Sequence, residues 1–320
     1  MNDLSLDIVI VNWNSGPLLG RCLASLPQAC SDGMHIEAAV VVDNGSRDGS
    51  ATFDAPQGLD VIAIRNHRNL GFAAACNLGA RAVHAPYLLF LNPDTQLEAR
   101  SLEGALRRLA SDRAGRIGIV GLALVGDDGR RQRNTARFPT PARMLGQALG
   151  LDRLAPALVR PQFLTDWDHL DTREVDQVPG AAMLMRRSDF ERLGGFDERF
   201  FLYMEDVDLA LRAREAGLAC IYIHDCVARH MGGGTTRRVR DKRLFYLLRS
   251  RVLYARKHFS PWGRAVAVGA TMLCEPVARL VAAAVRLDGA EAKAVVKATA
   301  WLWRAYPFHD AGERGEPPSR

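Results

Sequence analysis

Three acidic residues stand close together in the segment YMEDVD, residues 203–208, where the sequence predicts the start of a helix. Negative charges at a helix N-terminus are ordinarily stabilising, by about 0.3–1 kcal/mol each. Asp208 stands four residues before Arg212, so we expect these two side chains to form an ion pair along the helix. That leaves Asp206, or its neighbour Glu205, for chemistry. A carboxylate held ionised at this position could act as a general base.

A second candidate carboxylate, Asp94, follows the apolar run YLLFL at residues 87–91, which predicts a buried strand. The connecting sequence, Asn92-Pro93-Asp94, is either an ordinary turn or a cation or phosphate site at the carboxyl end of a strand. A cation that holds a diphosphate often takes only one or two carboxylates from the protein. His230, which precedes three glycines after a later strand, is the candidate second ligand, although a lone histidine is more often structural.

Polar residues also follow the first two predicted strands. Asp43 ends the run EAAVVV and is followed by NGSRDG, which is either a turn or the place of a carboxylate that accepts from a base N–H. Asn12 and Asn14 follow the first strand and could line the same nucleotide pocket. Neither segment is specific alone.

The segment NLGFAAACNLG at residues 69–79 favours close approach of the backbone at the start of a helix. Asn69, Gly71 and Asn77 are therefore candidates for nucleotide binding, together with Asn92. The alternative is ordinary helix packing through small residues, which this segment does not exclude.

Strands and helices alternate along the first part of the chain, and the predicted strands are continuously apolar. The strands are expected at residues 7–12, 37–42, 60–64, 87–91 and 117–125, with helices from 17, at 71–83 and at 102–109. This pattern predicts an α/β fold with a mostly parallel sheet and helices on both faces. Ligands of such sheets bind beyond the carboxyl ends of the strands, which is where the candidate polar residues fall.

The rest of the chain is less regular. Residues 130–176 contain four prolines and predict a variable region with short helices. A short helix is expected from the capping box at 188–191 to Gly194-Gly195. A second helix is expected at 205–216 and a strand at 219–227, and the pattern is helical from residue 241. We expect one domain at 1–235, with a nucleotide-binding part at about 1–125 and an acceptor and catalytic part at about 126–235. A basic amphipathic helical region at 236–309 and a disordered tail at 310–320 follow it.

Charge and cysteine content narrow the class of protein. The net charge is +6, yet residues 237–264 alone carry +9, so the remainder is acidic at −3. A nucleic-acid binder is therefore not expected. Six cysteines without a C-x-x-C pair indicate reduced thiols in a cytoplasmic protein. The N-terminus does not resemble a signal peptide, and no stretch of about 18 uncharged apolar residues predicts a membrane-spanning helix.

The basic stretch from residue 237 continues into an apolar helical pattern that ends near residue 287. Two interpretations stay open. The helices form a packed core with a solvated basic face, or they lie on an anionic membrane surface at the inner face of the cytoplasmic membrane.

Taken together and in order, these segments resemble family 2 glycosyltransferases with the GT-A fold, and in particular bacterial rhamnosyltransferase-like members. Seven segments over residues 11–235 carry the resemblance: VNWN, VVDNGSRDG, NLGFAAACNLG, LNPD, PGAAMLMRR, GGFDERFFLYMEDVDLALR and HMGGGT.

The resemblance implies a nucleotide-activated sugar donor, with Asp43 binding the base. Asp94 stands where the family has the last metal-binding aspartate of its D-x-D motif, and Asn92 replaces the first. His230 matches the residue that completes coordination of Mg²⁺ or Mn²⁺, and Asp206 matches the catalytic base. The implied reaction is an inverting transfer, with rhamnose from dTDP-rhamnose as the expected donor and a glycan or polyprenyl-diphosphate-linked acceptor.

Two other functions remain as alternatives. A sugar-phosphate nucleotidyltransferase would share the nucleotide pocket, but it normally has a glycine-rich loop where this chain has Asn12-Trp13-Asn14-Ser15. A catalytically degenerate nucleotide-sugar-binding domain is the other alternative, and the presence of all four candidate side chains argues against it.

Overall fold

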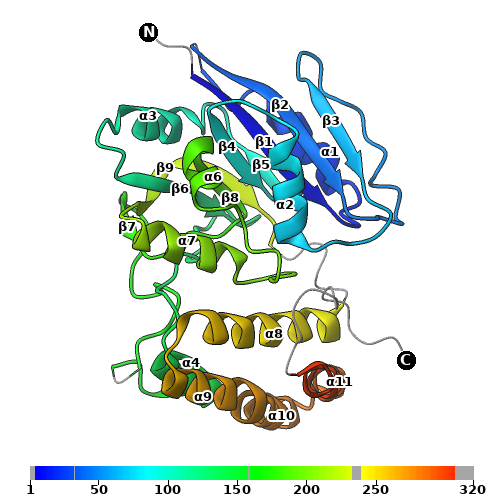
Figure 1. Cartoon of the computed structure of the whole chain (residues 1–320). Helices are drawn as coiled ribbons and strands as arrows, with labels where there is room; N and C mark the ends of the chain where they lie inside the picture. The colour runs from blue at the N-terminus through cyan, green and yellow to red at the C-terminus, as the bar shows by residue number, and fades with distance from the viewer. Residues whose placement is uncertain (1–3, 32, 158, 233–238, 307–320) are drawn as a thin grey trace. The chain divides into compact units, whose positions relative to one another are not determined.

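The computed structural model describes residues 4–31, 33–157, 159–232 and 239–306 (Figure 1). The chain divides into two compact units. Unit 1 comprises residues Met1–Arg137, Phe163–Asp197 and Asp206–Thr235, and unit 2 comprises Phe138–Gln162, Glu198–Glu205 and Thr236–Arg320. The predicted disordered tail, residues 310–320, lies outside the described residues.

Unit 1 holds the sheet and the helices around it (Figure 1). Its elements are β1 (Leu4–Asn12), α1 (Leu18–Ser25), β2 (Met34–Asp43), β3 (Val61–Arg65), α2 (Phe72–Arg81), β4 (Tyr87–Leu91), β5 (Thr95–Leu97), α3 (Glu103–Ser111), β6 (Ile117–Val125), β7 (Arg173–Val175), β8 (Ala182–Arg186), α6 (Arg187–Arg192), α7 (Glu205–Glu215) and β9 (Ala219–His230).

The strands form one sheet in the order β3-β2-β1-β4-β8-β6-β9-β5, with β7 paired to β9. The first four strands in this order are all parallel, as predicted. Beyond β4 the sheet is mixed, because β8 runs antiparallel to both of its neighbours and β5 and β7 run antiparallel to β9. The predicted parallel arrangement therefore holds for β3-β2-β1-β4 and for the pair β6–β9, and the antiparallel pairs are those that β8, β5 and β7 make.

Alternate residues of the central strands bury against helices on opposite faces of the sheet. Ile8 and Ile10 lie in the core cluster that contains the apolar faces of α1 and α3. The neighbouring Val9 faces α2, where a Cβ atom on Gly79 would lie 2.5 Å from its Cγ1 atom. Phe90 of β4 contacts Phe190 of α6 with ring centroids 4.9 Å apart. The small residues of α2 are thus explained by close helix packing.

The sequence predicted the strands at 87–91 and 117–125 with the observed bounds, and most other elements of unit 1 within a few residues. It did not predict the three strands β5, β7 and β8. All six cysteines are free thiols, as expected.

Unit 2 is helical. Its elements are α4 (Pro141–Ala148), α5 (Leu151–Leu154), α8 (Arg240–His258), α9 (Pro261–Gly269), a π-helical turn η2 (Ala270–Cys274), α10 (Glu275–Val285) and α11 (Gly289–Ala305). The sequence placed the boundary of the helical region near residue 235. The structure adds two earlier segments, 138–162 and 198–205, to the same compact unit.

The core of unit 2 forms mainly around α8. Leu244, Phe245, Leu248 and Val252 are buried and cluster with Leu302 and other apolar residues of α11. The segment 198–205 joins this core, since the ring of Phe201 stacks on that of Tyr246 at 4.5 Å and the Ser250 hydroxyl donates to the Leu202 carbonyl at 2.8 Å. The predicted basic amphipathic helix is therefore, along α8, largely a core helix.

The elements α9, η2 and α10 form one continuous helix from Pro261 to Val285, long and apolar enough to cross a membrane by length and composition. The sequence predicted no such helix, because Glu275, Pro276 and Arg279 interrupt its apolar run. Pro276 is accommodated in the first turn of α10, directly after the π-helical turn.

Candidate functional site

The carboxyl ends of β1 and β2 bring Asn12 and Asp43 together, as register partners in the parallel pair. Both side chains are buried, and the Asn12 Nδ2 group donates to Asp43 Oδ1 at 2.8 Å. The other carboxylate oxygen of Asp43 accepts from the backbone N–H of Ser46 at 3.1 Å. Because Asn12 also contacts the hydroxyls of Ser46 and Ser50, the pair holds the loop after β2 in one conformation.

Asn14 ties the loop after β1 to the loop after β2. Its backbone adopts the left-handed region, with φ of 50°, which asparagine tolerates better than most residues. Its N–H donates to the Ser46 hydroxyl at 2.9 Å, and its Oδ1 atom accepts from the Arg47 N–H at 2.8 Å. The two loops thus form one polar layer beyond the strand ends.

The start of α2 joins this layer through Asn44, which sequence reasoning did not single out. Asn44 is buried and donates to the Gly71 carbonyl at 3.1 Å. Asn69 accepts from the Gly71 N–H at 2.9 Å, and Gly71 has a φ of 88° that favours glycine. Asn77 lies further along α2 and clamps both backbone groups of Phe196 at 2.9 Å. These contacts are structural, and a nucleotide-binding role for Asn77 stays a prediction.

Asp94 and His230 are 136 positions apart in the sequence and adjacent in the structure. The loop after β4 carries Asp94 into β5, which pairs with the end of β9 so that Thr95 lies opposite His230. The Asp94 Oδ1 atom lies 3.4 Å from His230 Nε2, and the Met231 N–H donates to the Asp94 carbonyl at 3.2 Å. The strand β5 was not predicted, yet its pairing with β9 brings together Asp94 and His230, the pair that the sequence predicted.

Gln132 fixes the orientation of His230. Its Oε1 atom lies 3.0 Å from His230 Nδ1, and its Nε2 group donates to the His230 carbonyl at 2.6 Å. With the proton on Nδ1, the lone pair of Nε2 faces the Asp94 carboxylate. Two electron-pair donors face each other favourably only when a proton or a cation lies between them. Nothing in the sequence around residue 132 marked this role.

This pair fits a divalent cation. Adjacent ligands of a six-coordinate ion bonded at about 2.1 Å lie about 3 Å apart, close to the observed 3.4 Å. Within the described residues no group of three or more His, Cys, Asp or Glu residues could hold a metal. A cation at this pair would therefore need further oxygen ligands, of the kind a diphosphate and water supply.

Asp206 is the second residue of α7 and is half-buried. Its Oδ2 atom accepts from the Gly180 N–H at 3.0 Å and from the Gln177 amide at 3.4 Å, and its Oδ1 atom accepts from the Val207 N–H at 2.8 Å. Burial raises the pKa of Asp206 above the ordinary 3.8, although the backbone N–H groups act in the opposite direction. A carboxylate with a raised pKa is a stronger base.

One stretch of backbone connects Asp206 with the loop of Asp94. The residue after Gly180, Ala181, accepts from the Asn92 N–H at 3.0 Å, where β8 meets the end of β4. Gly180 and Ala181 are therefore held between the two carboxylate-bearing segments. These two residues belong to PGAAMLMRR, one of the seven segments that carry the family resemblance. In the structure the backbone of this segment binds Asp206 and Asn92.

The neighbouring acids of α7 differ from Asp206. Asp208 is fully buried and accepts from Arg212 Nε at 2.8 Å, which confirms the predicted ion pair. Arg212 also donates to the carbonyls of Leu193 and Gly195, so this pair fixes α7 to the preceding turn. Glu205 is buried at the first position of α7, and its catalytic role stays a prediction.

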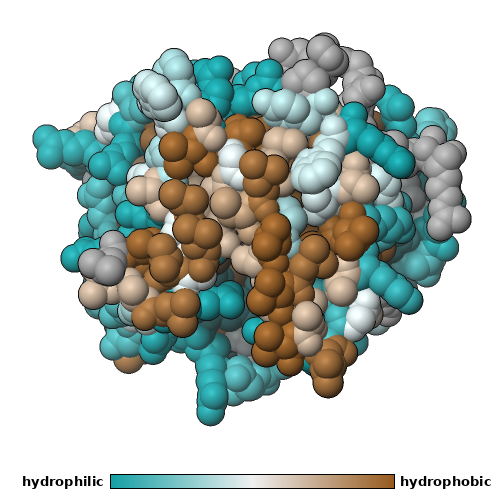
Figure 2. Space-filling model, turned by 90° about the horizontal axis from the view of Figure 1, so that it is seen from below, coloured by the Kyte–Doolittle hydropathy of each residue, from teal (hydrophilic) through white to brown (hydrophobic). Residues whose placement is uncertain are grey.

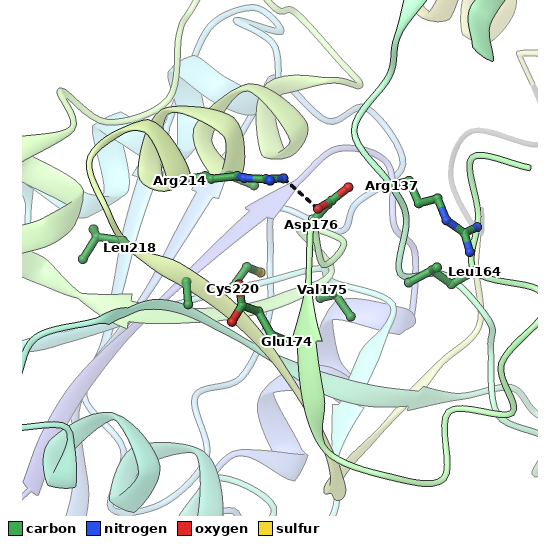
Figure 3. A pocket seen from close by; sticks show the side chains of 10 residues that line it. Arg137, Leu164, Glu174, Val175, Asp176, Arg214, Leu218 and Cys220 are labelled. Atoms are coloured by element: carbon green, nitrogen blue, oxygen red, sulfur yellow. Dashed lines mark hydrogen bonds and ion pairs between the residues drawn. The ribbon is translucent and has the colours of Figure 1, made fainter. Parts of the chain in front are cut away.

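A pocket of about 360 Å³ lies elsewhere in unit 1 (Figure 3). Its lining includes Asp176 and Arg214, which form an ion pair at 3.0 Å, and Cys220. None of the predicted site residues lines it. Burial raises the pKa of Cys220 to about 12, so this thiol is not a nucleophile near neutral pH. The pocket therefore contributes no reactive group to the site.

Comparison with known proteins identifies relatives of the chain. The family model described as glycosyl transferase family 2 matches residues 7–194. The N-acetylglucosaminyl-diphospho-decaprenol L-rhamnosyltransferase of Mycobacterium tuberculosis is 30% identical over 275 residues, covering 81% of this chain and 87% of that protein. The rhamnosyltransferase WbbL of Escherichia coli is 30% identical over 175 residues, covering 53% of this chain and 62% of its own length.

Solved structures share the fold at lower identity. The mannosyltransferase PcManGT of Pyrobaculum calidifontis, in complex with GDP-Man and Mn²⁺, matches with a TM-score of 0.54 and 17% identity, over 94% of this chain and 87% of that one. GalNAc-T7 with UDP, GalNAc and Mn²⁺ also gives a TM-score of 0.54 at 17% identity, over 82% of this chain and 52% of that one.

Proposed function

Because the chain belongs to glycosyl transferase family 2 and has the GT-A fold, we propose that it transfers a sugar, with inversion, from a nucleoside diphosphate to a lipid-linked glycan acceptor. The expected sugar is rhamnose, carried by dTDP. Two relatives are named for rhamnose transfer, and one of these names specifies a diphospho-decaprenol acceptor. Those names support the choice of sugar and acceptor class.

The observation that carries the proposal is the setting of Asp206. Its carboxylate is held by the Gly180 N–H, one residue from the backbone that binds the loop of Asp94. A base and a candidate diphosphate-binding segment are thus fixed to the same edge of the sheet. The raised pKa of Asp206 strengthens it as a base for an acceptor hydroxyl.

In the proposed reaction Asp206 accepts the proton of the acceptor hydroxyl. The hydroxyl oxygen forms a bond to the anomeric carbon, while the bond from that carbon to the phosphate oxygen breaks. The bonding electron pair leaves with the nucleoside diphosphate. A single displacement of this kind inverts the anomeric configuration and needs no covalent enzyme intermediate.

The donor is proposed to bind beyond β1 and β2. Asp43 accepts from a base N–H, and Asn12 keeps the Asp43 carboxylate in place through its 2.8 Å hydrogen bond. Asn14, Asn69, Gly71 and Asn92 belong to the same proposed donor pocket. The oxygen and N–H groups of these loops are suited to a polar ligand such as a pyrimidine base and its deoxyribose.

Asp94 and His230 would hold Mg²⁺ or Mn²⁺, with Gln132 orienting the histidine. A bound cation supplies neutralisation of the negative charge that develops on the departing diphosphate. Asn92 replaces a second carboxylate, so the proposed site relies on the diphosphate and water for its remaining ligands. The proposed location is the cytoplasm, where nucleotide sugars would reach the protein.

The test is a transfer assay with dTDP-rhamnose and polyprenyl-diphospho-N-acetylglucosamine, alongside UDP- and GDP-sugars. We expect a product whose new linkage has the anomeric configuration opposite to that of the donor. Retention of configuration would overturn the displacement at Asp206. No turnover, combined with no thermal stabilisation by any nucleotide and Mn²⁺, would favour a degenerate domain. A ligand at 100 times its Kd stabilises by about 2.7 kcal/mol, which a melting curve detects.

A further inference from the structure

Unit 2 exposes a large apolar face that its own core does not use. Figure 2 shows hydrophobic side chains gathered over one face of the molecule, with hydrophilic side chains around them. The exposed apolar residues of unit 2 are Leu149, Leu151 and Leu154 near α4 and α5, Trp262, Val266, Leu273, Val277, Val281, Val285 and Leu287 along α9 to α10, and Val296, Trp303 and Tyr306 on α11. Contiguous exposed apolar areas of this kind mark interaction surfaces.

The helix from Pro261 to Val285 carries the most regular part of this face. Leu273, Val277, Val281 and Val285 follow at intervals of four residues and are 58–79% exposed. Residues four apart lie on the same side of a helix. They therefore form a single ridge of branched aliphatic side chains directed away from the core of unit 2.

The opposite side of the same helix is packed within unit 2. Glu275 is buried and accepts from Arg251 of α8, and from Arg279 at 2.8 Å. Arg251 also donates to Gln147 of α4 at 3.0 Å, and the Thr271 hydroxyl is buried one turn away. A membrane-spanning position would strip these charges from their partners or carry them into hydrocarbon, at a cost of several kcal/mol. The helix therefore suits a position along a surface better than across a bilayer.

Along the segment 261–287 the exposed charges have one sign. Between residues 261 and 287 the exposed charged residues are Arg264 and Arg286, while Glu275, the only acid, is buried. Over the whole of unit 2, Lys and Arg outnumber Asp and Glu by 21 to 10. An apolar ridge with arginines at its ends matches the boundary between acyl chains and anionic headgroups.

We propose that this face of unit 2 binds the surface of an anionic lipid bilayer, with the helix 261–285 lying in the plane of the membrane. Trp262 is 85% exposed, and Trp303 is also exposed, as expected for side chains at the level of the headgroups. Aliphatic side chains without polar partners suit fluid lipid better than a specific protein partner, whose interface would carry hydrogen-bonding groups. The proposal stands apart from the proposed sugar transfer.

The experiment is sedimentation of the full chain with phosphatidylcholine vesicles that do or do not contain phosphatidylglycerol. The vesicles hold no glycolipid acceptor, so the result is independent of catalysis. Val281→Asp is compared with Leu170→Asp, because Val281 of unit 2 and Leu170 of unit 1 are both 58% exposed. Melting temperatures show that both variants fold.

We expect the wild-type protein and Leu170→Asp to pellet with anionic vesicles at low salt. We expect Val281→Asp to bind these vesicles at least roughly tenfold more weakly. A second measurement avoids new charges: brominated acyl chains should quench tryptophan emission, and Trp262→Phe should remove much of the quenching. A protein that stays in the supernatant overturns the proposal. An equal loss of vesicle binding in both aspartate variants also overturns it. The proposal fails too if the wild-type protein does not bind vesicles but forms a dimer, and Val281→Asp dissociates that dimer while Leu170→Asp does not.

Discussion

Two acids, one in each unit, have opposite surroundings. In unit 2, Glu275 is enclosed by Arg251 and Arg279. Burial alone would raise the pKa of Glu275, but the two cations outweigh burial and lower this pKa. In unit 1, Asp206 is held by backbone N–H groups and an amide, and burial raises its pKa. Glu275, which serves packing, is neutralised by full cations, whereas Asp206, the proposed base, is placed among neutral donors.

Asp208 shows that the same distinction operates within one helix. It stands two residues after Asp206, yet it is paired with Arg212, which also binds the turn before α7. The position of a carboxylate at a helix N-terminus therefore does not decide its role. Its role depends instead on whether the hydrogen-bond donors around it are charged or neutral.

The largest effect that would test this comparison is loss of transfer in Asp206→Asn. We expect the rate to fall by about 10²–10⁴-fold, because general base catalysis contributes that much. In the wild-type protein the rate should fall as pH drops through the pKa of Asp206, which lies above 3.8. Transfer assays over a range of pH, with nucleotide binding measured separately, check both points. Asp54→Asn, at an exposed position, is the control.

Glu275→Gln should have the largest effect on folding. Removing one partner of a buried ion pair costs about 3–5 kcal/mol, because Arg251 is left without its carboxylate. The lowered pKa means that Glu275 stabilises the fold above the ordinary value of 4.5 and loses this effect as pH falls through its folded-state pKa. Denaturant unfolding at neutral and acid pH should show a difference from wild type that narrows in acid. Glu291→Gln, at a partly exposed ion pair, should change little.

Gln132→Leu would sharpen the comparison at the cation pair. Loss of the group that orients a metal-binding histidine typically weakens metal affinity about 10–100-fold. Gln132→Glu keeps an acceptor for His230 Nδ1 and should restore part of the affinity. Calorimetric titration of Mn²⁺ in the presence of dTDP measures both. Equal affinity in Gln132→Leu and wild type would remove His230 from the proposed site.

The smallest effect is expected from Asp43→Asn. Loss of one charge-assisted hydrogen bond to the base costs about 1.5 kcal/mol, or roughly tenfold in donor affinity. The rate at saturating donor should stay near the wild-type value, because Asp43 does not touch the reacting atoms in the proposed reaction. Donor affinity and saturating rate are measured together, and a fall in the rate alone would contradict the assigned role.

The sequence predicted most of the elements around the proposed donor pocket of unit 1. It could do so because the strands that lead to this pocket are continuously apolar and end in polar loops. It also paired Asp94 with His230, first from the position of the histidine before three glycines and then from the family resemblance. It missed β5, which has three residues and no hydrophobic pattern of its own, and Gln132, whose role depends on a partner 98 positions away. Roles that depend on long-range pairing leave no local signal.

The helical unit was predicted less well, for a related reason. Segments 138–162 and 198–205 belong to it through tertiary contacts that composition does not report. The basic residues of α8 suggested a surface helix, but its apolar residues form the core, while the exposed ridge lies on the following helix. A periodic pattern shows that a helix has an apolar side, and only the packed structure shows whether that side is covered.

The π-helical turn at 270–274 has a consequence for the direction of the exposed ridge. In an uninterrupted α-helix each residue turns by about 100°, so Val285 would lie about 140° around the axis from Trp262. A π turn contains more residues and rotates the chain less per residue, which offsets part of this drift. The single wider turn thus acts as a phase correction that brings Trp262 more nearly into line with Val285, at the end of the ridge.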